Sequence, residues 1–405
     1  MKKLQEFKQQ DDIFLYLYLN DEFDKLNICL NEEQLDSLVD QLTQDMKSIS
    51  LNLSKEQLIG TKYCKEEDTE VDVFRILNMI DNFAKFIDNN KNNADQKIVK
   101  LADKFATDRL RYMYEQTPEY VIRQQQGHAD VEKNIDDNWG YALDLFEFLI
   151  TTAQEISANL DVTKLNNYQE NQDLYDALRR LHGRSCLIAY EILTLLRAGF
   201  ADGAYARFRT LYETVIIGIF ISDNGNEAAT KYLDFSLVND LKEAKLFNEY
   251  ASVLNEKRVS EEEILKLEEI KEQLTKEYGE NFAKGDYGWA SSFLNKKGVN
   301  FRDIEEKVDF SHMRPYYKVA SGKIHTGSSS LYSHIALPSE DNSKILTGAS
   351  GYGIDVPCRL TSYYLAMMTS NLLLNQSQTL EQIIYGQLLG KLRDDIIETL
   401  DAVVY

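Results

Sequence analysis

Residues 184–220 constrain the fold more than any other segment, because they read as two apolar helices that both carry charges. The apolar residues recur at helical spacing, and the pattern is interrupted at Ala198-Gly199. Charged side chains are costly inside a helical bundle unless they are paired. We therefore expect the charges of this helix pair to meet other polar groups at a polar centre.

The composition of the whole chain is that of a helical protein. Its 405 residues include only 4 prolines and 19 glycines, so residues that break helices are scarce. We predict an all-α fold in two domains, an acidic helical N-terminal domain over residues 1–165 and a helical-bundle domain over residues 166–405. A long Gly- and Ser-rich loop at residues 326–356 belongs to the bundle and is a candidate lid.

Capping residues mark the beginnings of several predicted helices. Asn31 precedes an apolar stripe at helical spacing, and a short helix over Asn300–Val308 begins at Asn300 or Phe301. Ser54 and Ser260 are each followed three positions later by Gln or Glu, which is the pattern of a capping box.

The polar segment Gln116–Asp137 is predicted to be a loop, because it contains Pro118 and Gly127. It also contains Arg123 and His128, whose R-x4-H spacing occurs in the helical ribonucleases called HEPN. A loop would not provide the helix that this motif requires, so we do not place an active site there.

The net charge of −21 excludes the broad basic surface of a general nucleic-acid binder. A site for RNA in such an acidic protein has to be compact. The four cysteines are scattered, which is typical of a reducing compartment, and no signal peptide or membrane-spanning run is evident. We expect a soluble cytoplasmic protein that does not associate with membranes. The five histidines have no metal-site spacing, so no metal or cofactor is expected.

The charges of the helix pair fall at spacings that bring them to common faces. Arg209 and Glu213 are four residues apart, and Arg184 and Glu191 are seven apart on the preceding helix. One interpretation is a set of salt bridges that fixes how the two helices pack. The other is a functional site in which one Arg and one Glu face a partner segment.

That partner segment is predicted to be a helix over Ser311–His325. Tyr317, Ser321 and His325 follow one another at intervals of four residues, and Arg314 precedes His325 by almost three turns. The pattern is typical of a site where an arginine binds phosphate and a histidine transfers a proton. A ladder of hydrogen bonds between helices is the structural alternative.

Three runs carry a family resemblance: E-x-L-x5-G at Glu191–Gly199, A-x2-R-x3-E at Ala206–Glu213 and Y-x3-S-x3-H at Tyr317–His325. In this order they resemble a bacterial domain-of-unknown-function family, number fifty-six seventy-seven, over about residues 174–376. The resemblance implies an all-helical fold with a general likeness to HEPN and abortive-infection proteins of phage defence. It implies no particular activity.

Two functions of different classes remain open. The first is an antiphage-defence or stress effector whose bundle cleaves RNA without a metal. The second is a non-catalytic helical sensor or scaffold that binds a protein partner, encoded in the same defence operon, with a purely structural polar centre. In either case we expect a homo-oligomer. The first hypothesis assigns catalysis to His325, Arg209 and Glu213, and substrate binding to Arg184, Glu191, Arg314, Tyr317 and Ser321.

Overall fold

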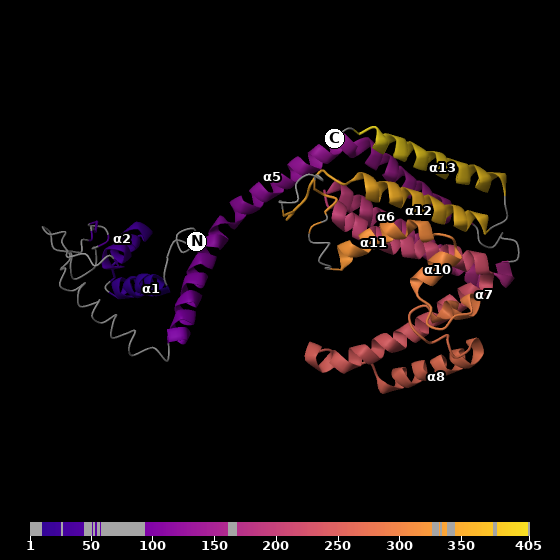
Figure 1. The fold of residues 1–405 in the computed structure, drawn as a ribbon, viewed down its shortest axis with the longest axis horizontal. Helices are drawn as coiled ribbons and strands as arrows, with labels where there is room; N and C mark the ends of the chain where they lie inside the picture. The colour runs from indigo at the N-terminus through magenta and orange to yellow at the C-terminus, as the bar shows by residue number, and fades with distance from the viewer. Residues whose placement is uncertain are drawn as a thin grey trace. The chain divides into compact units, whose positions relative to one another are not determined.

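The computed structural model describes residues 10–25, 27–43, 51, 53–54, 57, 94–160, 168–325, 332, 334–337, 345–375 and 379–403. Every regular element within these ranges is a helix (Figure 1), which confirms the predicted all-α fold. Contacts divide the chain into two compact units, Met1–Val121 and Ile122–Tyr405. The domain boundary predicted between residues 165 and 166 lies outside the described ranges and stays a prediction.

The first unit contains α1 (Gln10–Asp24) and α2 (Glu32–Thr43). The predicted cap of α2 is confirmed, since the Gln34 amide donates to Asn31 Oδ1 at 2.9 Å and the Asn31 amide donates to Gln34 Oε1 at 3.0 Å. Ser54 and Gln57 form the capping box that the sequence predicts at this position. The core of this unit consists of Leu15, Leu19, Phe23, Ile28, Leu35, Leu38, Val39 and Leu53.

A single helix, α5, runs from Ala94 to Ala158, so the loop predicted at Gln116–Asp137 is wrong. Most residues of this segment favour helices, and a proline costs less where the carbonyl that loses its partner is open to water. Arg123 and His128 therefore lie on a helix, with both side chains exposed. The division between the two units falls within α5.

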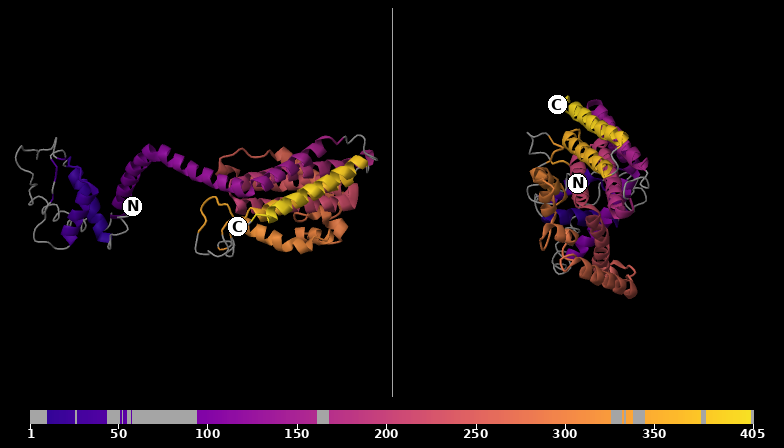
Figure 2. Two further views of the ribbon diagram at one scale, coloured as in Figure 1. Left: turned by 90° about the horizontal axis from the view of Figure 1, so that it is seen from above. Right: turned by 90° about the vertical axis from the view of Figure 1, so that its right-hand side faces the viewer.

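The second unit is a bundle built around α6 (Gln172–Arg197) and α7 (Ala201–Leu254). The C-terminal part of α5, α12 (Asp355–Leu374) and α13 (Leu380–Asp401) lie alongside this pair (Figure 2). All five helices contribute fully buried side chains to one core, among them Phe146, Leu178, Ile216, Leu365 and Ile396.

α12 packs closely against both central helices. A Cβ atom at Gly218 of α7 would lie 2.9 Å from Met368 Sδ, so the absence of a side chain permits this approach. On α6, His182 Nε2 lies 3.0 Å from Thr369 Oγ1 of α12. Both contacts are buried, which makes α12 part of the core.

The break predicted between the central helices is confirmed. Gly199 has a φ of 80°, and a Cβ atom there would lie 2.9 Å from the carbonyl oxygen of Ser350. The Ser350 amide donates to the Gly199 carbonyl at 3.0 Å, and Trp139 Nε1 donates to the Gly351 carbonyl at 3.2 Å. The described end of the Gly- and Ser-rich loop therefore packs against the α6–α7 turn.

The second half of α7 pairs with α8 (Glu261–Tyr278), and we call residues 226–278 the arm. α7 bends at Gly225, whose φ of 73° and ψ of −160° are not helical. The predicted capping box of Ser260 and Glu263 begins α8, and Lys245 forms an ion pair with Glu268. Figure 1 shows the two helices of the arm side by side.

Shorter elements connect the arm to α12. They are η4 (Gly288–Ala290), α9 (Ser291–Leu294), α10 (Phe301–Lys307), η5 (Ser311–Met313) and α11 (Arg314–Ile324), while η3 (Tyr168–Glu170) precedes α6. The predicted short helix begins at Phe301, and Asn300 caps it. The helix predicted over Ser311–His325 is a 3-10 turn followed by α11, with His325 immediately after its last residue.

His182 is a buried neutral side chain between α6 and α12, with an exposed fraction of 1%. The Thr369 hydroxyl donates its single proton to the Leu365 carbonyl at 2.9 Å. It must therefore accept from His182, so the imidazole carries its proton on Nε2. Burial lowers the pKa of His182 to about 4.

We expect this histidine to make the fold sensitive to mild acid. The unfolded chain protonates it below its ordinary pKa of about 6.5, whereas the folded chain protonates it only near pH 4. The free energy of unfolding should therefore fall by about 3 kcal/mol as the pH decreases from 6.5 to 4. His182→Gln keeps a donor for Thr369 and cannot titrate, so denaturation curves should show a weaker pH dependence. Equal pH dependence in both proteins would contradict this assignment.

Candidate polar site between two helices

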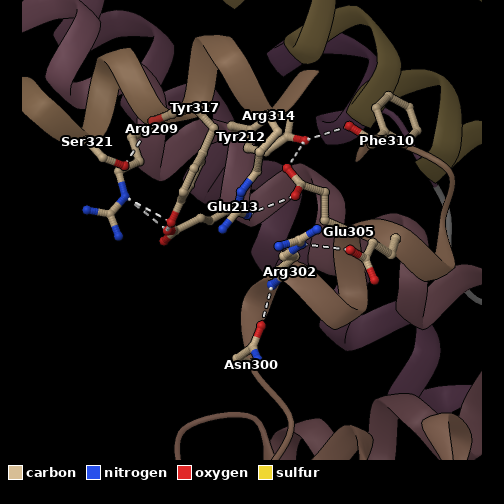
Figure 3. A network of polar contacts seen from close by, with 11 residues as sticks. Arg209, Tyr212, Glu213, Asn300, Arg302, Glu305, Phe310, Arg314, Tyr317 and Ser321 are labelled. Carbon is tan, nitrogen blue, oxygen red and sulfur yellow. Dashed lines mark hydrogen bonds and ion pairs between the residues drawn. The ribbon is translucent and has the colours of Figure 1, made fainter. Parts of the chain in front are cut away.

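The polar centre lies where α11 packs against α7 (Figure 3). Arg209 and Glu213 are one turn apart on α7, and Arg209 Nε donates to Glu213 Oε1 at 3.1 Å. The Tyr317 hydroxyl on α11 donates to the same carboxylate oxygen at 2.6 Å and accepts from Arg209 Nε at 3.2 Å. The structure thus brings together three of the predicted residues in one triangle.

This triangle is half-buried. The Arg209 and Glu213 side chains have exposed fractions of 23% and 25%, and the Arg209 guanidinium lies over the Tyr317 ring, 5.1 Å from its centroid. Burial raises the pKa of Tyr317, the Glu213 carboxylate raises it further, and Arg209 opposes both effects. Tyr317 therefore remains a hydrogen-bond donor at neutral pH.

His325 reaches the triangle from the end of α11. Arg209 Nη1 lies 3.2 Å from His325 Nε2. Because a guanidinium can only donate, Nε2 has to accept, which requires a neutral imidazole with its proton on Nδ1. The histidine is exposed, so its accepting nitrogen lies where a ligand could take the place of the Arg209 contact.

Arg314 and Ser321 lie on the same helix but have other partners. The Ser321 hydroxyl donates to the Tyr317 carbonyl at 2.8 Å, so its proton is used within α11. The Arg314 guanidinium lies over the Tyr317 ring, 4.8 Å from its centroid, and Nη1 donates to Glu305 Oε2 at 2.8 Å. Arg314 therefore joins the polar centre to a second, deeper network.

The deeper network was missed by the sequence analysis. Glu305 of α10 has an exposed fraction of 0% and accepts from the Tyr212 hydroxyl at 2.6 Å as well as from Arg314. Burial raises the pKa of Tyr212 far above its ordinary value, and the hydrogen bond to Glu305 raises it further. A glutamate in a short charged helix is expected at the surface, and its burial depends on Tyr212, which is 93 positions away.

The two charges predicted on α6 do not join the centre. Glu191 forms an ion pair with Arg207 of α7, and these residues lie equally far from Gly199 on the two sides of the turn. Arg184 is exposed, and no hydrogen bond or ion pair among the described residues links it to Arg209, Glu213 or Tyr317. The spacing placed Arg184 and Glu191 on one helix face, but it could not show which neighbour that face meets.

The described residues also bear on metals and membranes. Within the ranges of the structure, no three His, Cys, Asp or Glu side chains gather where they could hold a metal ion. None of the helices described is both long and apolar enough to cross a bilayer.

The fold and the centre define a class of protein: a helical bundle in which an Arg–Glu–Tyr triangle from two helices contacts an exposed histidine. Residues 175–344 match a family that is described as a family of unknown function (DUF5677). The matched segment includes the triangle and His325, and the match confirms the predicted family resemblance for these residues. No curated protein and no solved structure matches the chain.

Proposed function

We propose that the protein is a bacterial defence or stress effector whose helical bundle cleaves RNA, with the polar centre as its active site. The observation that carries this proposal is the 3.2 Å contact between Arg209 Nη1 and the accepting Nε2 of an exposed histidine, His325. Cleavage of a phosphodiester needs a cation that neutralises charge on the phosphate and a group that moves a proton. Arg209 and His325 supply both without a further cofactor.

The reaction that suits these groups is attack of a ribose 2′-hydroxyl on the adjacent phosphorus. A phosphate oxygen takes the place of His325 as the partner of Arg209 Nη1, which frees Nε2. Nε2 removes the 2′ proton, the 2′ oxygen bonds to phosphorus, and the bond from phosphorus to the 5′ oxygen breaks. The imidazolium then gives its proton to the leaving 5′ oxygen, so the products are a 2′,3′-cyclic phosphate and a 5′-hydroxyl end.

Glu213 and Tyr317 act as positioning residues in this mechanism. Their oxygens both lie within 3.2 Å of Arg209 Nε, so they fix the orientation of the guanidinium while Nη1 remains available. A cation held in place before the substrate binds loses less conformational entropy during the reaction. The test of the proposed function is the integrity of cellular RNA after expression of the wild-type chain and of His325→Ala.

A second function, binding of a protein partner without catalysis, is favoured by a different surface. Leu246, Tyr250 and Val253 follow one face of α7 in the arm, with exposed fractions of 60%, 50% and 82%. An exposed apolar stripe of this kind is typical of an interaction site. In this alternative the polar centre only fixes α11 against α7, and the arm recognises the partner.

Val253→Lys separates the two functions, because it places a charge on the stripe and is far from His325 in the sequence. If the bundle cleaves RNA, we expect this variant to cleave like the wild type and to have an unchanged melting temperature, since Val253 is exposed. RNA integrity and cell growth after expression are the measurements. A variant that loses its effect on growth, beside a His325→Ala protein that keeps it, would support the partner-binding function instead.

A further inference from the structure

The bend of α7 creates an open groove beside the polar centre. Side chains from before the bend, at Ile217, and from after it, at Tyr232 and Asn239, line the same groove of about 640 Å³. Gly225, between them, adopts a φ of 73° that other residues rarely adopt. The size is within the range of about 300–1,000 Å³ that is common for small-ligand sites.

Two observations place this groove next to the proposed active site. Arg209, Glu213 and Ile217 recur every four residues on one face of α7, so the groove begins about 6 Å along the helix axis from Glu213. Tyr287 lines the groove, and burial together with the Glu213 and Tyr317 charges raises its pKa, which requires proximity to the triangle. A single strand of RNA could therefore contact the groove and the triangle at the same time.

The chemistry of the lining indicates what the groove can hold. Tyr232 and Tyr287 provide half-buried aromatic surface, whereas Phe235 and Trp289 are buried, with exposed fractions of 3% and 2%. Ser236 and Asn239 provide neutral donors and acceptors. Three charged side chains also line the groove, Asp176, Arg180 and Asp286, and each carboxylate has a cationic neighbour. Asp176 Oδ2 lies 2.7 Å from Arg180 Nε, and Asp286 Oδ1 lies 3.9 Å from Lys242 Nζ.

An aromatic groove with neutral polar groups suits a flat, uncharged ring with hydrogen-bonding edges. We propose that it binds an unpaired nucleobase of the RNA strand whose phosphate lies at Arg209 and His325. Proteins recognise single-stranded RNA in this manner, by stacking on aromatic rings and bonding to base edges. The inference rests on the proposed function and adds to it that the substrate is single-stranded at the site of cleavage.

The first test uses the full-length chain with His325→Ala, so that the probe stays intact. The probe is a fluorescent single-stranded oligoribonucleotide of about eight nucleotides, within the usual site sizes, and binding is followed by anisotropy. Adding Ser236→Glu places a negative charge at an exposed position of the groove, and we expect about tenfold weaker binding, or about 1.4 kcal/mol. The matched control is Ser252→Glu, which introduces the same charge at an exposed position of the same helix. The protein with this control change should bind the probe as tightly as the His325→Ala protein.

Two results would overturn the inference: equal affinities of the two glutamate variants, or equal affinity for a duplex of the same sequence. Cleavage by the wild type together with either of these results would contradict the groove assignment and leave the proposed function standing. Binding that depends on Ser236, by a wild-type chain that cleaves no RNA, would support the groove and contradict the proposed function.

Discussion

His325→Ala is expected to lower RNA cleavage by about 10²–10⁴-fold, the usual contribution of a side chain that transfers a proton. The histidine is exposed and follows the last residue of α11, so its loss leaves no cavity in the core. The melting temperature should therefore remain close to that of the wild type. Gel analysis of RNA, with identification of cyclic phosphate ends, measures the activity, and thermal unfolding monitors the fold.

His312→Ala is the matched control for this experiment. His312 is also exposed and lies on the preceding turn η5, where its ring stacks on Phe310 instead of contacting Arg209. It should retain full activity. An active His325→Ala protein would contradict the proposed mechanism, and a large loss of stability in that variant would assign His325 to structure.

Glu305→Ala should have the largest effect on stability, about 3–5 kcal/mol, because it removes one partner of a buried ion pair. The change would leave the Arg314 guanidinium and the Tyr212 hydroxyl without their acceptor inside the protein. Both side chains pack around Tyr317, so the polar centre should also lose its geometry. Denaturation with urea, followed by circular dichroism, measures the loss of unfolding free energy.

The neighbouring glutamate provides the control. Glu306 pairs with Arg302 at the surface, with an exposed fraction of 48%, so Glu306→Ala should change the unfolding free energy by less than about 1 kcal/mol. Replacing Glu305 and Arg314 together by apolar residues should recover part of the lost stability, since no unpaired charge remains. Similar losses for Glu305→Ala and Glu306→Ala would show that the buried network is not what stabilises this region.

Local signals in the sequence were sufficient for much of the fold. The caps at Asn31 and Ser260 and the break at Gly199 depend on nearby residues, and each was predicted. The continuous helix α5 was missed because a proline in an exposed helix costs less than the prediction assumed.

The candidate site was predictable only in part. Arg209, Glu213 and Tyr317 lie on the helices predicted for them, and His325 lies one residue beyond α11. Several contacts between α7 and α11 bring the four residues together. The role of Glu305 depends on Tyr212, 93 positions away, and on whether a short charged helix is buried. Such information lies in the packing of distant segments, which residue spacing along one helix does not contain.

α12 packs closely against residues 175–344, the segment that matches the family. Gly218 and His182, both within residues 175–344, face Met368 and Thr369 of α12, which lie outside the match. Cut out on its own, the matched segment would expose the apolar and polar surfaces that α12 normally covers. In this chain the matched segment therefore depends on α12 to cover that surface.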